Sequence, residues 1–238
     1  MRAGLDIHLP NFKKALLSAA RSIYRLAHPK NRELARIRRS NLEQFQPFTT
    51  TKMNRYPMLF RIVSEQLADK VPQRILSFGC SSGEEVRSLR AYCPHAFITG
   101  VDCNRRVLEK AQSADPCELS TYIEGDRPKP NERYDLILAL AVFRHGDLRG
   151  EEIFENCEAK LSFERVNAAV TRLGAVLTIG GWLAWGNNHF RFEDMDAAQK
   201  YCGALVAGRP TMPDPLSGSN NRLIETSPRP PLLVQKVV

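Results

Sequence analysis

The most constraining feature of this chain is a regular alternation of short apolar runs with amphipathic stretches, which begins after Pro72. The runs have the length of strands, and the stretches between them have the length and periodicity of helices. Strands separated by such helices join through right-handed crossovers and form a parallel sheet. The expected strands are Ile75–Phe78, Phe97–Val101, Thr121–Glu124, Asp135–Leu140, Ala175–Ile179 and Leu232–Val237. The expected helices are Pro57–Leu67, Glu84–Tyr92, Arg105–Ser113 and Glu151–Leu173.

A glycine-containing turn, Gly79–Glu85, connects the first expected strand to the helix after it. Small residues in such a turn let a ligand approach the backbone at the carboxyl edge of the sheet. A dinucleotide-binding turn would need glycine at two positions that hold Ser81 and Glu84. Acids at the start of the helix would also oppose a pyrophosphate. The turn therefore predicts a phosphate-free, cationic ligand such as S-adenosylmethionine; an ordinary strand–helix turn is the alternative.

Acids also follow the next two expected strands. Asp102, in Gly100–Asn104, stands where a carboxylate can accept both ribose hydroxyls of a nucleoside. A helix N-cap is the alternative role for Asp102 or Asn104. Asp126, after Glu124 and Gly125, can accept from an adenine amino group, although Gly-Asp is also ordinary turn chemistry. The fourth strand ends at the same edge, so these features predict one shared crevice.

The stretch from about Ile75 to Gly181 resembles the class I S-adenosylmethionine-dependent methyltransferases. The resemblance implies an α/β three-layer sandwich with a mostly parallel, seven-stranded, Rossmann-like sheet and an antiparallel last strand. It also implies methyl transfer from S-adenosylmethionine as cofactor. The cofactor-binding residues that it implies are Gly79, Cys80, Ser81, Gly83, Asp102, Cys103, Asp126, Arg127, Leu140 and Ala141.

The turn also departs from the pattern of that family. Many members have an acid two residues before the first glycine, where this chain has Ser77, and a middle glycine, where it has Ser81. The string Gly79–Glu85 is similar to the loop of chemotaxis-receptor glutamate methyltransferases, but only over this short stretch. The block Asn54–Pro57 resembles uncharacterised bacterial members and indicates nothing about the acceptor.

Catalysis in such enzymes is mainly the placement of an acceptor atom in line with the methyl group. A general base helps where the acceptor must lose a proton, and His145, just past the fourth strand, is the candidate. His189 is a second candidate, and each histidine can instead have a structural role in its loop. Asn187 and Asn188 could orient a polar acceptor or simply form a turn. Tyr56 could close over the cofactor or pack at a helix start.

The positive charge of the chain lies in its N-terminal arm. Residues 1–39 hold ten cations and two acids, which accounts for the whole net charge of +8. Within this arm, apolar residues recur at helical spacing from Phe12 to Leu26, and Pro29 ends that pattern. We expect a basic helical arm and linker over 1–54 and a cofactor-binding domain over 55–238. Residues 12–39 could contact RNA or an anionic membrane, or form a solvated helix whose apolar stripe packs on the domain.

A neutral domain favours a small-molecule acceptor: a small polar metabolite or a natural-product or glycan intermediate. The alternatives are an RNA or protein methyltransferase that uses the arm, and a non-catalytic module that binds S-adenosylmethionine.

The spacing of the cysteines bears on metal binding, and the hydropathy pattern bears on the cellular location. The six cysteines form no C-x-x-C pair, so neither a zinc site nor thioredoxin chemistry is expected. No apolar run approaches the length of a membrane span, and no secretory signal is evident. We therefore expect a cytoplasmic protein with reduced thiols, the alternative being a mitochondrial transit peptide in the first 28 residues.

Overall fold

The chain divides by its contacts into two units, residues 1–41 and 42–238. The computed structural model describes residues 28–149, 154–210 and 213–238. In the first unit it describes α2 (Pro29–Arg39), which has proline at its start and arginines in its last turn, both favourable placements. Glu33 and Arg36 form an ion pair within this helix, at 2.7 Å. The expected helix from Phe12 to Leu26 lies outside the described residues.

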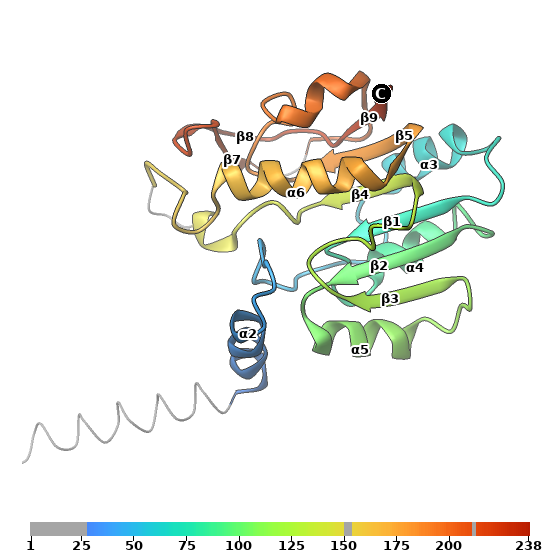
Figure 1. Ribbon diagram of the computed structural model, residues 1–238, viewed down its shortest axis with the longest axis horizontal. Coiled ribbons are helices and arrows are strands. Elements are labelled where there is room, and N and C mark those ends of the chain that lie inside the picture. The colour runs from blue at the N-terminus through green and yellow to red at the C-terminus, as the bar shows by residue number, and fades with distance from the viewer. Residues whose placement is uncertain (1–27, 150–153, 211–212) are drawn as a thin grey trace, which may run out of the picture. The chain divides into compact units, whose positions relative to one another are not determined.

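The second unit is built on a seven-stranded sheet with the order β3-β2-β1-β4-β5-β9-β6 (Figure 1). Its strands are β1 (Arg74–Phe78), β2 (Phe97–Asp102), β3 (Ser120–Glu124), β4 (Tyr134–Leu140), β5 (Leu177–Gly186), β6 (Tyr201–Val206) and β9 (Leu232–Lys236). Strands β1 to β5 are parallel to one another, and β9 is antiparallel to both β5 and β6. This arrangement confirms the expected mostly parallel, seven-stranded sheet with an antiparallel last strand. A separate hairpin pairs β7 (Asp214–Ser217) with β8 (Leu223–Ser227).

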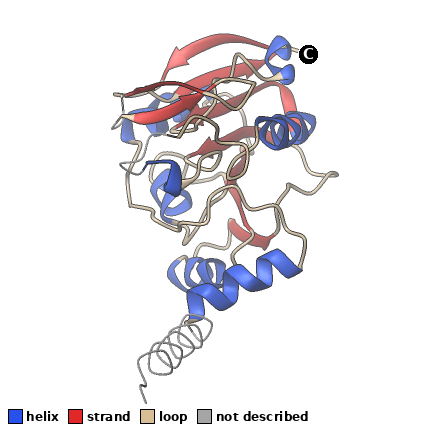
Figure 2. Cartoon of the chain, turned by 90° about the vertical axis from the view of Figure 1, so that its left-hand side faces the viewer, coloured by secondary structure: helices blue, strands red, loops and turns tan. Residues whose placement is uncertain are grey.

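Helices cover both faces of the sheet, and Figure 2 shows them (blue) flanking the strands (red). Helices α3 (Pro57–Gln66), α4 (Glu84–Arg90) and α5 (Arg105–Ala114) share one apolar cluster, and α6 (Phe163–Val176) belongs to the other. Strand β4 supplies both clusters, because alternate side chains of a strand point to opposite faces. Leu136 and Leu138 lie in the first cluster, whereas Ile137 and Ala139 lie in the second. Two short 3-10 helices, η1 (Gly146–Arg149) and η2 (Asp196–Lys200), complete the described elements.

The expected long helix Glu151–Leu173 was wrong over residues 154–162. Helix α6 begins only at Phe163, and residues 154–162 are irregular. The turn at Asn221 holds this segment: its carbonyl accepts from the Cys157 N–H at 2.9 Å, and its side-chain oxygen accepts from the Phe163 N–H at 2.6 Å. Cys157 is nevertheless fully buried in the same cluster as α6. The apolar periodicity therefore indicated burial correctly but not helix.

The expected strand Ala175–Ile179 was displaced toward the N-terminus. Helix α6 continues through Val176, and β5 runs from Leu177 to Gly186. The part of β5 that pairs continuously with β4 is Trp182–Gly186, in register with Leu136–Leu140. The buried pairing with β4 thus determines where the strand lies.

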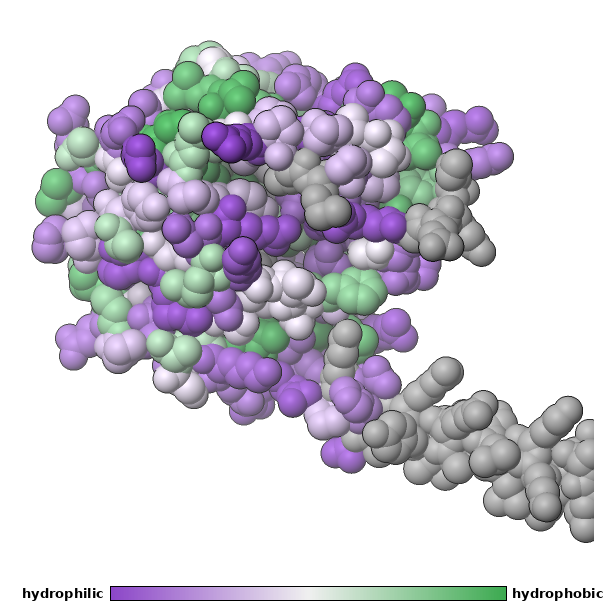
Figure 3. Space-filling model, turned by 180° about the vertical axis from the view of Figure 1, so that it is seen from behind, coloured by the Kyte–Doolittle hydropathy of each residue, from purple (hydrophilic) through white to green (hydrophobic). Residues whose placement is uncertain are grey.

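Polar side chains dominate the face of the molecule shown in Figure 3, where hydrophilic residues (purple) separate small groups of hydrophobic ones (green). Within the described part of the chain, no helix is both long and apolar enough to cross a membrane.

Candidate active site

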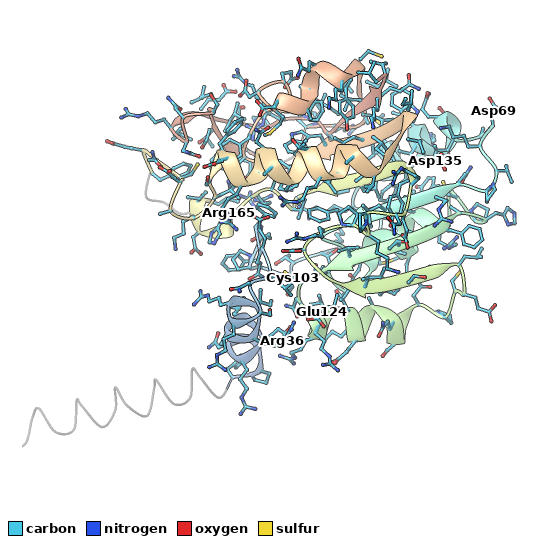
Figure 4. All side chains as sticks on the ribbon, in the orientation of Figure 1. Arg36, Asp69, Cys103, Glu124, Asp135 and Arg165 are labelled. Carbon is cyan, nitrogen blue, oxygen red and sulfur yellow. The ribbon has the colours of Figure 1, made fainter. Side chains whose placement is uncertain are left out.

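A cavity of about 370 Å³ opens at the carboxyl edge of the parallel strands. Its walls come from the turn after β1, the ends of β2 and β4, and the segment that precedes α3. In Figure 4, Cys103 and Glu124 mark this edge at the ends of β2 and β3, and Asp135 lies at the opposite edge. The described residues from four parts of the sequence therefore meet at one site, as parallel topology requires.

The turn after β1 contributes its first half to the cavity. Gly79, Cys80 and Ser81 line it, and the N–H groups of Gly79 and Cys80 donate to the Val101 carbonyl. Gly79 has a φ of +76°, and an added Cβ would lie 2.7 Å from a methyl of Val142. Glycine is therefore required here by both backbone and packing.

Gly83, expected to bind the cofactor, does not line the cavity. It precedes α4 with a φ of +80°, and an added Cβ would lie 2.8 Å from the Tyr122 hydroxyl and 3.0 Å from the Ala111 Cβ. This glycine lets α4 pack closely against α5 and β3. We therefore assign Gly83 to packing.

Asp102 lies at the end of β2 and lines the cavity together with Cys103. Its carboxylate accepts from the Ser81 N–H at 3.0 Å and from the Asn104 N–H at 2.8 Å. Asn104 caps α5, because its side chain accepts from the N–H of Val107. The cap role thus belongs to Asn104, while Asp102 ties the turn after β1 to the end of β2.

Asp126 follows β3 and also lines the cavity. It accepts from the Glu43 N–H at 2.9 Å and from Arg127 Nε at 2.8 Å. Burial alone would raise the pKa of this carboxyl, but the bonds from Arg127 and Glu43 hold the pKa below its ordinary value. The Arg127 side chain is 62% exposed and does not line the cavity, so it reaches the site only through Asp126.

The end of β4 forms the opposite wall, with Leu140 and Ala141. Ala141 has a φ of +60°, and its N–H donates to the Gly186 carbonyl at 2.8 Å. A non-glycine residue in this region is uncommon and is held here by its neighbours. The chain therefore turns sharply where β4 leaves the sheet.

Glu85, in the first turn of α4, lines the cavity and was not among the expected site residues. Its carboxylate accepts from the Ser77 hydroxyl at 2.7 Å. Desolvation raises its pKa to about 7, against the lowering effects of Ser77 and Arg55. Ser77 stands where related turns carry an acid, so the side chain of Glu85 brings a carboxylate to that place from the helix. The spacing of Ser77 and Glu85 along the sequence was the signal from which this contact could have been predicted.

The segment 43–54 also lines the cavity, although the sequence analysis placed it with the arm. The Glu43 carboxylate accepts from Arg165 at 3.1 Å and from Arg172 at 2.6 Å, both on α6. Further along, the Thr49 carbonyl accepts from the Ser81 hydroxyl at 3.2 Å. These bonds hold the segment across the carboxyl edge of the sheet. Residues 42–54 thus lie in the second unit, and the polar character of this segment gave no sign of it.

A group of cations lines the side of the cavity next to β4. Arg144 donates to Asp214 at 3.0 Å, and Arg149 forms an ion pair with the same carboxylate at 2.9 Å. Arg55 and the buried Tyr56 belong to the same wall. Among these, only Tyr56 was considered from the sequence.

The two candidate bases do not line the cavity. His145 accepts from the Asp147 N–H through Nδ1 at 3.3 Å, and burial lowers its pKa. His189 is fully buried 3.4 Å from Asp214, and burial lowers its pKa as well. Asn188 is buried too and bridges the Phe143 N–H and the Ala139 carbonyl. The geometry gives these residues structural contacts, and the catalytic role of His145 stays a prediction.

Comparison with known proteins agrees with this geometry. A family model described as a methyltransferase domain matches residues 76–184. Residues 76–184 are thus similar to a methyltransferase domain. A curated relative, the malonyl-[acyl-carrier protein] O-methyltransferase of Halalkalibacterium halodurans, is 34% identical over 89 residues. That match spans 34% of this chain and 33% of the relative, about a third of each.

Solved structures similar to this chain include a further methyltransferase. The plantazolicin methyltransferase BpumL in complex with SAH has a TM-score of 0.42 and 17% identity, over 73% of this chain and 60% of that one. TehB from Haemophilus influenzae has a TM-score of 0.46 and 15% identity, over 74% and 61%. YcgJ from Bacillus subtilis has a TM-score of 0.49 and 12% identity, over 76% and 98%.

The matched residues 76–184 hold the turn after β1, Asp102, Asp126 and the end of β4. Segment 43–56 and Asp214 lie outside this range. The walls of the cavity therefore divide between residues inside the matched range and residues outside it.

Proposed function

We propose that this protein transfers a methyl group from S-adenosylmethionine to a small polar acceptor. The observation that carries the proposal is the set of acids at the carboxyl edge of the sheet. Asp102, Asp126 and Glu85 line one cavity beside the turn Gly79–Ser81. Beside the turn, these acids disfavour a phosphate and attract the ammonium and sulfonium groups of a cationic cofactor.

The donor set fits such a cofactor part by part. Asp102 keeps lone pairs for ribose hydroxyls beyond the two backbone bonds it accepts. Asp126, fixed in its ionised form by Arg127 and Glu43, supports an acceptor role toward an adenine amino group. Glu85 offers a desolvated carboxyl to a positive charge near the turn. The sharp exit at Leu140–Ala141 completes the wall beside the reacting atoms.

Bound S-adenosylmethionine supplies an electrophilic methyl carbon, whose bond to sulfur breaks as the acceptor atom bonds to it. What the chain must do is hold the acceptor in line and exclude water. Segment 43–54 supports the exclusion of water, because it is hydrogen-bonded to α6 and to the turn after β1 across the cavity. Among the described residues no histidine lines the cavity, which favours an acceptor atom that is already deprotonated or that ionises near neutral pH without a base.

Calorimetry on the full-length protein tests the cofactor assignment. We expect S-adenosylhomocysteine to bind with micromolar-range affinity and NAD not to bind. Binding of NAD without binding of S-adenosylhomocysteine would refute the proposal. Incubation with methyl-labelled cofactor and fractionated metabolites then separates an enzyme from a non-catalytic module, because only an enzyme moves the label to an acceptor.

A further inference from the structure

Apart from Glu85, which interacts with Arg55, the charged residues at the strand ends of the cavity wall are sorted by sign. Asp102 and Asp126 stand at the ends of β2 and β3, on one side of β1. Arg144 and Arg149 follow β4, on the other side of β1. Arg55 belongs with these two arginines, because it influences the charge of Arg144. The nucleoside side of the proposed cofactor site is thus acidic, and the remaining side is basic.

The basic side carries more positive charge than its partner neutralises. The carboxylate of Asp214 forms ion pairs with both Arg144 and Arg149. Arg55 is exposed and forms no ion pair with any described residue. Burial lowers the pKa of Arg144, Asp214 opposes this, and the charges of Arg149 and Arg55 lower the pKa further. Asp214 therefore pairs with two guanidinium groups, which repel each other and Arg55, while the charge of Arg55 also acts on the carboxyl of Glu85.

Two buried polar atoms in this wall lack partners within the described residues. They are Arg144 Nε and the Tyr56 hydroxyl. The side chains are almost fully buried, with 4% of Arg144 and 7% of Tyr56 exposed, and both line the cavity. The Asn187 side chain lies near the Tyr56 hydroxyl, but the two groups do not meet the geometry of a hydrogen bond. Buried donors without acceptors are costly, so this wall is prepared for a group that accepts hydrogen bonds.

We propose that Arg144 and Tyr56, assisted by Arg55 and Arg149, bind an oxyanion carried by the methyl acceptor, either a carboxylate or a phosphate. This inference rests on the proposed function and specifies its substrate class. Guanidinium groups bind such oxyanions through paired, charge-assisted hydrogen bonds. The same oxyanion balances the arginine charges that would otherwise oppose a cationic cofactor in the shared cavity.

The test measures anion binding to the full-length protein saturated with S-adenosylhomocysteine. Succinate and inorganic phosphate are titrated separately, which distinguishes a carboxylate from a phosphate. The variants are Arg144→Met, Arg55→Met and Tyr56→Phe, and the matched control is Arg106→Met, which removes an exposed cation on α5 outside this cavity. Tyr56→Phe keeps the buried ring, and Arg55→Met changes an exposed residue, so both remain informative if Arg144→Met fails to fold.

We expect one of the two anions to bind, with the same affinity for the wild-type protein and for the Arg106→Met control. Its affinity should fall about tenfold or more in Arg144→Met and about threefold in Tyr56→Phe and Arg55→Met. Binding of neither anion, or equal loss in the control, would overturn the inference. Binding of S-adenosylhomocysteine is measured first in every variant: its absence in the wild type contradicts the proposed function, whereas its presence without anion binding contradicts only this inference.

Discussion

The substitution Glu85→Gln should stabilise the ligand-free protein while weakening its cofactor site. The buried carboxyl of Glu85 has a pKa of about 7 in the folded chain, against an ordinary value of 4.5. Because the folded pKa is the higher one, the contribution of this group to stability is full below pH 4.5 and is lost as pH rises through 7. Glutamine cannot ionise, and its side-chain oxygen can still accept from Ser77. Removal of the carboxyl should therefore help most at alkaline pH.

The size of the effect follows from these two pKa values. Compared with a side chain that cannot ionise, Glu85 lowers the stability of the folded state by about 3 kcal/mol at pH 8 and about 1 kcal/mol at pH 5, because the unfolded chain ionises more readily. The stability gained by Glu85→Gln should thus grow by about 2 kcal/mol between these pH values. For a chain of this length, that difference corresponds to about 4–8 °C in Tm.

Thermal unfolding of wild type and Glu85→Gln at several values from pH 5 to pH 8, without ligand, measures this difference. Glu84→Gln is the matched control, because it removes a carboxylate from the same helical turn without touching the cavity wall. In parallel, affinity for S-adenosylmethionine should rise with pH through 7 in the wild type and stay flat and weaker in Glu85→Gln. A stability gain that does not grow with pH, or one that Glu84→Gln reproduces, would refute the reasoning.

Three further predictions concern other residues. Asp102→Ala should weaken S-adenosylhomocysteine binding by about 30- to 1,000-fold, because it removes roughly 2–4 kcal/mol of charge-assisted hydrogen bonds. A variant that binds the ligand normally and only has a lower Tm would show that the role of Asp102 is purely structural. Gly83→Ala should lower stability by about 1–3 kcal/mol in urea unfolding, because its Cβ would meet Tyr122 and Ala111 at a positive φ, and leave the ligand affinity within about threefold. Deletion of residues 1–39 should leave a protein that retains its circular dichroism and binds S-adenosylhomocysteine, since the cavity residues begin at Glu43; an insoluble product would contradict it.

The sheet was predictable because its signals are local. Each of β1 to β4 is a short apolar run bounded by turn residues, and the observed bounds differ from the expected ones by a residue or so. The order of acids along the sequence then placed Asp102 and Asp126 at one edge, because parallel strands all end on the same side of the sheet. These residues were found without knowing any tertiary contact.

What the sequence could not reveal depends on contacts between distant residues. Glu43 reaches Asp126 across 83 positions, and Arg144 reaches Asp214 across 70. Neither pair leaves a pattern in the sequence. An acid or an arginine has the same sequence context whether its side chain is solvated or forms an ion pair with a distant residue. The start of α6 failed for the same reason: the Asn221 turn competes for the backbone of the preceding segment.

Taken with the charges of the cavity wall, these distant contacts support the proposal that the cofactor and the acceptor bind on different sides of one cavity. The local signals place acids near the β2 and β3 exits, where the family-matched part of the chain forms the wall. The long-range contacts bring Arg144, Arg149 and Asp214 together beside the β4 exit, with Asp214 outside the matched part. Because Glu85 and Arg55 interact across this boundary, loss of either charge should alter binding on the other side. A double-mutant cycle of Glu85→Gln and Arg55→Met, read by cofactor affinity, should therefore be non-additive, and strict additivity would show that the two sides act independently.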